Sequence, residues 1–331
     1  MKDFWKTLPA PIIGLSPMDG YTDSAMRHIC KDVNPDIITY TEFTSADGLH
    51  HGAERVKMKL AFTPSEQPII AQIFGKDVDA FITAAKWCEE QGFAGIDLNM
   101  GCPSKKVVKS EHGVALRRCS DLAFRLVEAV ATNTTLPVSV KTRLGWSDAS
   151  DLVSFGIGVQ NAGSDMICIH ARTYKEPYNV PAQWEPVYEL KRALNIPVIG
   201  NGGIISIEDG MSKLGNLDGF LIGQAAIGNP WVFDPNGAPQ SIVEKIPLIK
   251  AHTHYLIASK GERVGTQEIR KYLLAYIKQF PGSRAYRSRF ARVASLYEIM
   301  ALLDEVATID DQTSVPVAGF FSKEEPVEAV S

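Results

Sequence analysis

Gly95-Ile96-Asp97-Leu98-Asn99-Met100-Gly101-Cys102-Pro103-Ser104 is a short apolar strand that runs directly into a Gly-Cys-Pro turn. Loops that follow buried strands often carry functional side chains, and Pro103 stiffens the chain behind the thiol. Cys102 is therefore placed where a ligand can reach it. A free cysteine is also commonly a small, half-buried apolar residue, so this stretch alone leaves both interpretations open.

Seven other short apolar runs alternate with segments of helical spacing. In chain order, the eight runs are residues 12–18, 37–43, 68–75, 95–99, 137–143, 165–170, 197–203 and 219–223. Continuous apolar runs are typical of parallel strands that are buried on both faces. An open doubly wound sheet is the alternative, but the first run lacks the GxGxxG turn of that fold. Since eight strand–helix units fit within the ~250 residues of a (β/α)8 barrel, we predict an α/β protein built on a TIM barrel.

Polar or glycine residues follow nearly every predicted strand. In a barrel the carboxyl ends of all strands meet at one mouth, where active sites lie. Each residue alone has a structural explanation, such as a turn for Gln72 or a buried histidine for His170, but their joint occurrence predicts a site. The residues at these ends are Pro17, Met18, Gln72, Asn99, Cys102, Lys141, Arg143, His170, Arg172, Asn201, Gly202, Gly203 and Gly223.

These residue types fit a planar redox cofactor that carries a phosphate. Glycines in the Gly200–Gly203 stretch and Gly223 let backbone N–H groups approach a phosphate where such barrels bind one. Lys141 and His170 can hold the electron-rich end of a ring, and Gln72 can bond its carbonyl edge. A thiol with a pKa of about 8.5 is protonated at neutral pH and can donate a proton. Flavin mononucleotide (FMN) meets these requirements.

The chain changes character after about residue 240. Residues 249–292 have helical spacing and carry ten Lys or Arg residues against two Glu, in a chain whose net charge is -4. A basic helical unit on an acidic chain is typical of polyanion binding, although a solvated basic face is the simpler alternative. We therefore divide the chain into a barrel (1–240), a basic helical domain (241–310) and an acidic tail (311–331) that we expect to be disordered.

The remaining composition favours a reducing compartment. The five cysteines form no CxxC pair, which argues against a disulfide framework or a structural metal site. The N-terminus lacks a signal-peptide pattern, and no apolar run approaches the ~18 residues needed to cross a bilayer. We expect a cytoplasmic monomer that does not bind membranes.

Several motifs occur in a fixed order along the chain. They are SPMDGYTD (16–23), QIFG (72–75), IDLNMGCP (96–103), KKV (105–107), VKTR (140–143), IHART (169–173), GNGG (200–203) and GNPW (228–231). Phe280-Pro281-Gly282 then precedes the last basic cluster. From residue 10 to about 295 the chain closely resembles the tRNA-dihydrouridine synthase family. The resemblance implies an FMN enzyme that reduces the C5–C6 double bond of a tRNA uridine, with NADPH re-reducing the flavin.

The resemblance also implies individual roles. Cys102 would be the general acid that protonates C5 while hydride reaches C6, and Asn99 would orient substrate and flavin. The target base would be flipped into the mouth while the basic helical domain binds the RNA. The other implied contacts are Pro17, Met18, Gln72, Lys141 and His170 with the flavin ring; Asn201, Gly202, Gly203, Gly223 and Gln224 with ribityl and phosphate; and Arg143, Arg172 and Tyr178 with the uracil side.

The chain departs from the family pattern at two places. The family usually has an Arg that contacts the FMN phosphate where this chain has Gln224, so we expect weaker FMN binding, with Arg143 as a candidate replacement. The loop after the cysteine usually reads Gly-Ser/Cys-Gly-Ala-Ala-Leu, and residues 111–116 read Glu-His-Gly-Val-Ala-Leu instead. This change places His112 near the mouth, where it can alter substrate choice.

Two other functions remain open. An FMN barrel that acts on a small pyrimidine, such as one resembling dihydroorotate dehydrogenase, would also use flavin and a thiol, but it does not need a basic helical domain. A flavin-free RNA-binding barrel would explain Gln224. Flavin absorbance in the purified protein separates the second alternative from a flavoenzyme.

Overall fold

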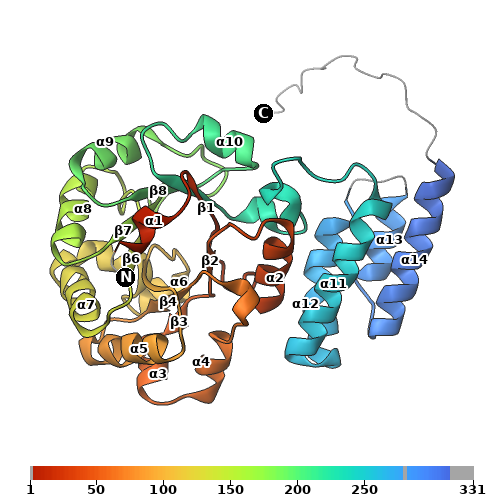
Figure 1. Ribbon diagram of the computed structural model, residues 1–331, viewed down its shortest axis with the longest axis horizontal. Coiled ribbons are helices and arrows are strands. Elements are labelled where there is room, and N and C mark those ends of the chain that lie inside the picture. The colour runs from red at the N-terminus through yellow and green to blue at the C-terminus, as the bar shows by residue number, and fades with distance from the viewer. Residues whose placement is uncertain (1–2, 279–281, 314–331) are drawn as a thin grey trace, which may run out of the picture.

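The computed structural model describes residues 3–278 and 282–313. Figure 1 shows a barrel of strands wrapped by helices, with a second group of helices beside it. The strands are β1 (Ile12–Leu15), β2 (Thr39–Tyr40), β3 (Thr44–Ser45), β4 (Ile69–Phe74), β5 (Gly95–Met100), β6 (Val138–Arg143), β7 (Met166–His170), β8 (Val198–Asn201) and β9 (Gly219–Ile222).

The barrel is closed and parallel. Its strand order is β1-β9-β8-β7-β6-β5-β4-β2, and β3 also pairs with β4. Every strand pairing is parallel, and a parallel bridge between Gly14 and Ile38 joins the two ends of this order. The predicted (β/α)8 TIM barrel is confirmed.

Helices cover the outside of the barrel and form the second group. Those that follow the barrel strands are α2 (Ser24–Val33), α3 (Ala46–His50), α4 (Glu54–Lys59), α5 (Val78–Glu90), α6 (Lys105–Lys109), α7 (Ser120–Asn133), α8 (Leu152–Asn161), α9 (Glu185–Ala193) and α10 (Ile207–Ser212). A short helix, α1 (Phe4–Thr7), precedes the barrel. The second group comprises α11 (Ile242–Lys260), α12 (Glu262–Tyr276), α13 (Ser283–Phe290) and α14 (Leu296–Thr313).

Strand β5 shows how alternating side chains build the two layers of the fold. All six of its residues are buried. Ile96, Leu98 and Met100 belong to the apolar core that also contains residues of α5 and α7. Since successive strand residues face opposite sides, Asp97 and Asn99 face the other way, into the barrel. The barrel interior therefore carries polar groups close to the mouth.

The second predicted strand differs from the structure. Residues 37–43 were expected as one run, but β2 and β3 are two-residue pairings with β4 that are separated by Thr41, Glu42 and Phe43. The backbone N–H of Gln72 donates to Thr41 Oγ1 rather than to a strand carbonyl. This side-chain bond interrupts the ladder, and it leaves Phe43 to line the cavity at the mouth.

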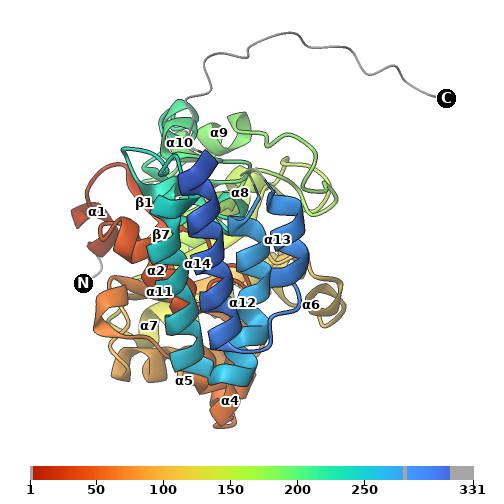
Figure 2. The ribbon, with the colours of Figure 1, turned by 90° about the vertical axis from the view of Figure 1, so that its right-hand side faces the viewer.

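The helices α11–α14 lie side by side along one flank of the barrel (Figure 2). They share an apolar core with α2, in which Met26 and Cys30 pack with residues such as Ile249 and Leu256 of α11. An ion pair of 2.6 Å between Lys260 Nζ and Asp23 Oδ2 crosses the same contact. Helix α11 thus begins close to the predicted boundary at residue 240, but it is packed directly onto the barrel.

The mouth is also tied to α12. Tyr272 donates its hydroxyl hydrogen to the carbonyl of Tyr21, and Lys271 donates to the carbonyl of Gly20. Both carbonyls belong to the loop after β1, which lines the mouth through Pro17, Met18, Asp19 and Tyr21. The mouth and the helical group are therefore one connected structure.

The disordered C-terminal tail stays a prediction. Helix α14 continues through Thr313, past the predicted start of the tail at residue 311. The remaining tail residues, 314–331, and the Phe280-Pro281 pair of the last motif lie outside the described residues. Within the described part of the chain, no helix combines the length and the apolar character that spanning a bilayer requires.

Candidate active site at the barrel mouth

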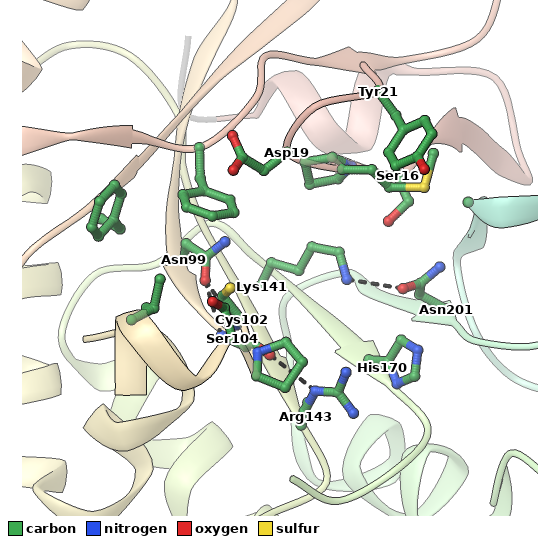
Figure 3. Close-up of a pocket in the computed structure, with 18 of the residues that line it drawn as sticks. Ser16, Asp19, Tyr21, Asn99, Cys102, Ser104, Lys141, Arg143, His170 and Asn201 are labelled. Atoms are coloured by element: carbon green, nitrogen blue, oxygen red, sulfur yellow. Dashed lines mark hydrogen bonds between the residues drawn. The ribbon is translucent and has the colours of Figure 1, made fainter. Parts of the chain in front are cut away.

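A cavity of about 1300 Å³ opens at the carboxyl ends of the barrel strands. Figure 3 shows the Lys141 side chain crossing this cavity towards Asn201, with Cys102 and Arg143 beside it. One of the predicted site residues, Gln72, does not line this cavity. The predicted residues that do are Pro17, Met18, Asn99, Cys102, Lys141, Arg143, His170, Arg172, Tyr178, Asn201, Gly202, Gly203, Gly223 and Gln224.

The loop that carries Cys102 is fixed to the end of β5. Asn99 Oδ1 accepts hydrogen bonds from the backbone N–H of Cys102 at 3.0 Å and of Gly101 at 3.3 Å. Arg143 Nε donates to the Gly101 carbonyl at 2.9 Å. A Cβ on Gly113 would lie 2.9 Å from the Cys102 carbonyl oxygen, and Gly113 has φ 62°, so only glycine fits there.

Cys102 is a half-buried thiol whose surroundings keep it protonated. Burial raises its pKa, and the nearby Asp19 carboxylate acts in the same direction. The Ser104 backbone N–H and the Arg143 charge oppose the shift without cancelling it. A thiolate nucleophile requires a lowered pKa, whereas a proton donor must hold its proton at neutral pH. The site therefore suits Cys102 as an acid.

Gln72 lies in a buried hydrogen-bonded chain behind the cavity. Its Nε2 donates to Asp97 Oδ2 at 2.7 Å, and its Oε1 accepts from Asn99 Nδ2 at 2.8 Å. Ser139 donates to the other Asp97 oxygen at 2.6 Å. Both functional atoms of the Gln72 amide are engaged by protein, so its predicted contact with a flavin ring remains a prediction.

Asp97 is fully buried at the start of this series of hydrogen bonds. Burial raises its pKa to about 6, although the hydrogen bonds from Ser139 and Gln72 and the charge of Lys141 favour the carboxylate. Asp97 was not among the site residues predicted from the sequence. The signal that could have identified it is an acidic residue in an otherwise apolar run, because a buried carboxylate needs partners.

Lys141 projects from β6 and meets Asn201 at the end of β8. Its Nζ donates to Asn201 Oδ1 at 2.9 Å, and Asn201 Nδ2 donates in turn to the Leu221 carbonyl at 2.8 Å. Burial lowers the pKa of Lys141, and the charge of Asp97 opposes that shift. One of the three ammonium N–H groups is engaged by a described residue, so donors remain to face a ligand.

His170 ends β7 with one nitrogen unsatisfied. Its Nδ1 is buried and has no hydrogen-bond partner among the described residues. Burial lowers the pKa of His170 well below its ordinary value, and the charges of Arg143, Lys141 and Arg172 lower it further. The imidazole is therefore neutral, and a buried ring nitrogen without a partner indicates a place for a polar ligand atom.

Glycines form the opposite end of the cavity. Gly202 and Gly203 have φ 121° and 68°, which side-chain-bearing residues rarely adopt. Arg172 Nη2 would lie 3.4 Å from a Cβ on Gly203, whereas Arg143 is engaged with the carbonyls of Gly101 and Thr173. Of the two arginines, Arg172 is therefore the one beside the glycines, and the role of Arg143 towards a phosphate stays a prediction.

Comparison with known proteins gives consistent matches along the chain. Residues 14–313 match the family model described as dihydrouridine synthase (Dus). The chain is 34% identical over 303 residues to "Probable tRNA-dihydrouridine synthase 1" of Synechocystis, covering 88% of this chain and 84% of the relative. It is 31% identical over 314 residues to "Probable tRNA-dihydrouridine synthase 2" of Bacillus subtilis, covering 92% and 96%.

The buried carboxyl of Asp97 should make the folded protein less stable as the pH rises from about 4 to about 6. An unfolded aspartate titrates near 3.9, so with a folded pKa of about 6 the folded state holds more protons across this window. The free energy of unfolding should fall by roughly 3 kcal/mol through this group. Asp97→Asn should remove that part of the pH dependence, measured by urea unfolding at a series of pH values.

Asp79→Asn is the matched control, because Asp79 is exposed on α5. It should keep the pH dependence of the wild type. If Asp97→Asn showed the same slope as the wild type, the raised pKa of Asp97 would be wrong.

Proposed function

The chain belongs to the dihydrouridine synthase family, and on that premise we propose that it is an FMN-dependent tRNA-dihydrouridine synthase re-reduced by NADPH. The observation that carries the proposal is the mouth itself, where a protonated thiol, a buried ammonium and an unsatisfied His170 nitrogen line one cavity. Its volume of about 1300 Å³ is above the ~300–1,000 Å³ of most small-molecule sites. It offers room for two ligands, a flavin and a pyrimidine.

The residues of the mouth fit FMN. Lys141 and His170 offer donors to the polar edge of the ring, and the backbone of Pro17 and Met18 lines the same cavity. At the glycine end, Gly202, Gly203, Gly223 and Gln224 would take the ribityl chain and phosphate, with Arg172 as the neighbouring cation. When bound, reduced FMN supplies hydride for C6 of the uridine.

Cys102 would complete the reduction by donating its proton to C5. The raised pKa keeps that proton on the sulfur until transfer, and the charge of Arg143 favours the thiolate that is left. Asn99 holds the loop by accepting the backbone N–H of Cys102, so the sulfur keeps its position over the cavity. Water can then return a proton to the thiolate, because Cys102 is only partly buried.

We assign tRNA binding to α11–α14, with a smaller basic surface than the sequence predicts. Lys250, Lys260 and Arg289 pair with Asp304, Asp23 and Glu305, respectively. Lys271 lies 3.9 Å from Glu268, and Arg270 donates to the Val293 carbonyl. Five further cations form no ion pair with any described residue, and several lie on or next to α13. They are Arg263, Lys278, Arg284, Arg287 and Arg292. Phosphate contacts of this kind bind RNA without reading its sequence.

Turnover of unmodified tRNA is the decisive test. The purified protein should show flavin absorbance and, with NADPH, should form dihydrouridine at one or a few defined positions of tRNA transcripts, mapped by mass spectrometry. Reduction of a small free pyrimidine instead of tRNA would favour the dihydroorotate dehydrogenase-like alternative. A colourless protein that binds tRNA without turnover would favour the flavin-free alternative.

Replacing Cys102 tests the proton donor. Cys102→Ala should keep FMN and tRNA binding but should lower kcat by about 10²–10⁴-fold, the usual contribution of a positioned acid. Cys119→Ala is the control, because Cys119 is exposed and does not line the cavity. Single-turnover rates of dihydrouridine formation should separate the two variants. Equal rates in Cys102→Ala and wild type would rule out the acid role.

Restoring a cation at residue 224 tests the phosphate end. Gln224→Arg should tighten FMN binding by about tenfold or more, because a charge-assisted hydrogen bond to phosphate replaces a neutral one. Titration of flavin fluorescence with the apoprotein measures the Kd. Gln240→Arg, at an exposed position outside the cavity, should leave the Kd unchanged. An unchanged Kd in Gln224→Arg would place the phosphate elsewhere.

A further inference from the structure

Part of the cavity is lined by residues to which the proposed reaction assigns no role. The residues assigned to FMN lie mainly after β6, β7, β8 and β9. Across the mouth, on the side of β2, β3 and β4, the lining continues without an assigned role. That lining includes Phe43, Phe74, His112, Arg55 and Lys106, and we call it the β4 side of the mouth.

Three half-buried rings form one wall of the β4 side. The ring centroids of Phe43 and Phe74 are 5.2 Å apart at 89°, and those of Phe74 and His112 are 5.6 Å apart at 64°. All three side chains line the cavity, and none is fully buried. Aromatic surfaces of this kind bind planar bases by stacking or edge contact.

Two cations stand beside these rings. Arg55 of α4 and Lys106 of α6 are exposed, and neither forms an ion pair with a described residue. Lys59, one turn further along α4, differs because its Nζ is 2.8 Å from Asp19 Oδ1. The β4 side therefore offers two uncommitted positive charges next to an aromatic wall, a combination suited to a base with its phosphate.

His112 lies in the loop that departs from the usual family pattern. Glu111, just before His112, has φ 62°. Among the described residues it is the only one other than glycine with a positive φ. This conformation is easy for the glycine usual in the family pattern and strained for a glutamate. An ion pair of 2.7 Å from Lys76 Nζ to Glu111 Oε2 helps to hold it. The chain thus maintains a strained loop that carries an aromatic residue into the mouth.

We propose that the β4 side of the mouth is a second nucleotide subsite, in which Phe43, Phe74 and His112 contact a base and Arg55 and Lys106 contact its phosphate. The inference rests on the proposed function. Two ligands of that reaction carry this chemistry: the RNA nucleotide next to the target uridine, and the adenine nucleotide of NADPH.

Two sets of variants test the subsite through its two kinds of contact. His112→Ala removes a ring and His112→Tyr retains one, while His51→Ala alters an exposed histidine outside the cavity. Arg55→Gln combined with Lys106→Gln removes both charges, while Lys57→Gln removes a lysine of α4 that pairs with Glu54. The Kd for tRNA is measured by filter binding and the Kd for NADPH by its fluorescence, with thermal melting to verify folding.

His112→Ala and the double charge variant should each raise the Kd for the same ligand, either tRNA or NADPH, by about tenfold. His112→Tyr and the two controls should keep Kd values near those of the wild type. Weaker tRNA binding assigns the subsite to the neighbouring RNA nucleotide, and weaker NADPH binding assigns it to the adenine nucleotide. If folded variants of both sets kept both Kd values, the subsite would be overturned while the synthase activity of the wild type stood. A wild-type protein that forms no dihydrouridine would overturn the proposed function, and the two Kd values would still decide the subsite.

Discussion

The hydrogen bonds that Gln72 makes in the barrel interior set the orientation of the mouth. The buried carboxylate of Asp97 can accept hydrogen bonds but cannot donate them, so the Gln72 amide must direct its Nε2 towards Asp97. Its oxygen then faces Asn99 and accepts from Nδ2, which leaves Asn99 Oδ1 for the backbone of Gly101 and Cys102. One buried charge thus determines the direction of each bond up to the thiol loop.

The parallel register of the barrel brings the remaining groups together. Asn99 pairs with Lys141, and His170 pairs with Asn201, across neighbouring strands. Residues from separate strand–helix units therefore reach the same height, and their side chains meet at one end of the barrel. Burial disfavours the charged form of both groups, so it lowers the pKa of Lys141 and raises the pKa of Asp97. The site combines proton donors with a low-dielectric surrounding.

Much of this arrangement could be predicted from the sequence, because apolar strands and their polar ends follow simple periodic rules. The barrel and the residues at the ends of its strands were identified in this way, and all of these residues except Gln72 line the cavity, whereas Tyr178 and Gln224 were implied by the family resemblance. Three features depend on tertiary contacts instead: Thr41 Oγ1 interrupts the second strand, Gln72 turns to Asp97 instead of lining the cavity, and Lys260 pairs with Asp23 rather than facing an RNA. Each is a choice of hydrogen-bond or ion-pair partner, which residue spacing does not encode.

The contact between α12 and the loop after β1 connects the helical group to the mouth of the barrel. Tyr272 and Lys271 hold the carbonyls of that loop, and α11 shares its core with α2, so direct contacts link the helical group to the loop that lines the mouth. Under the proposed function, an RNA held on the helices would reach the thiol across this contact. How an RNA lies on the helices would then, under that function, contribute to which uridine reaches the thiol.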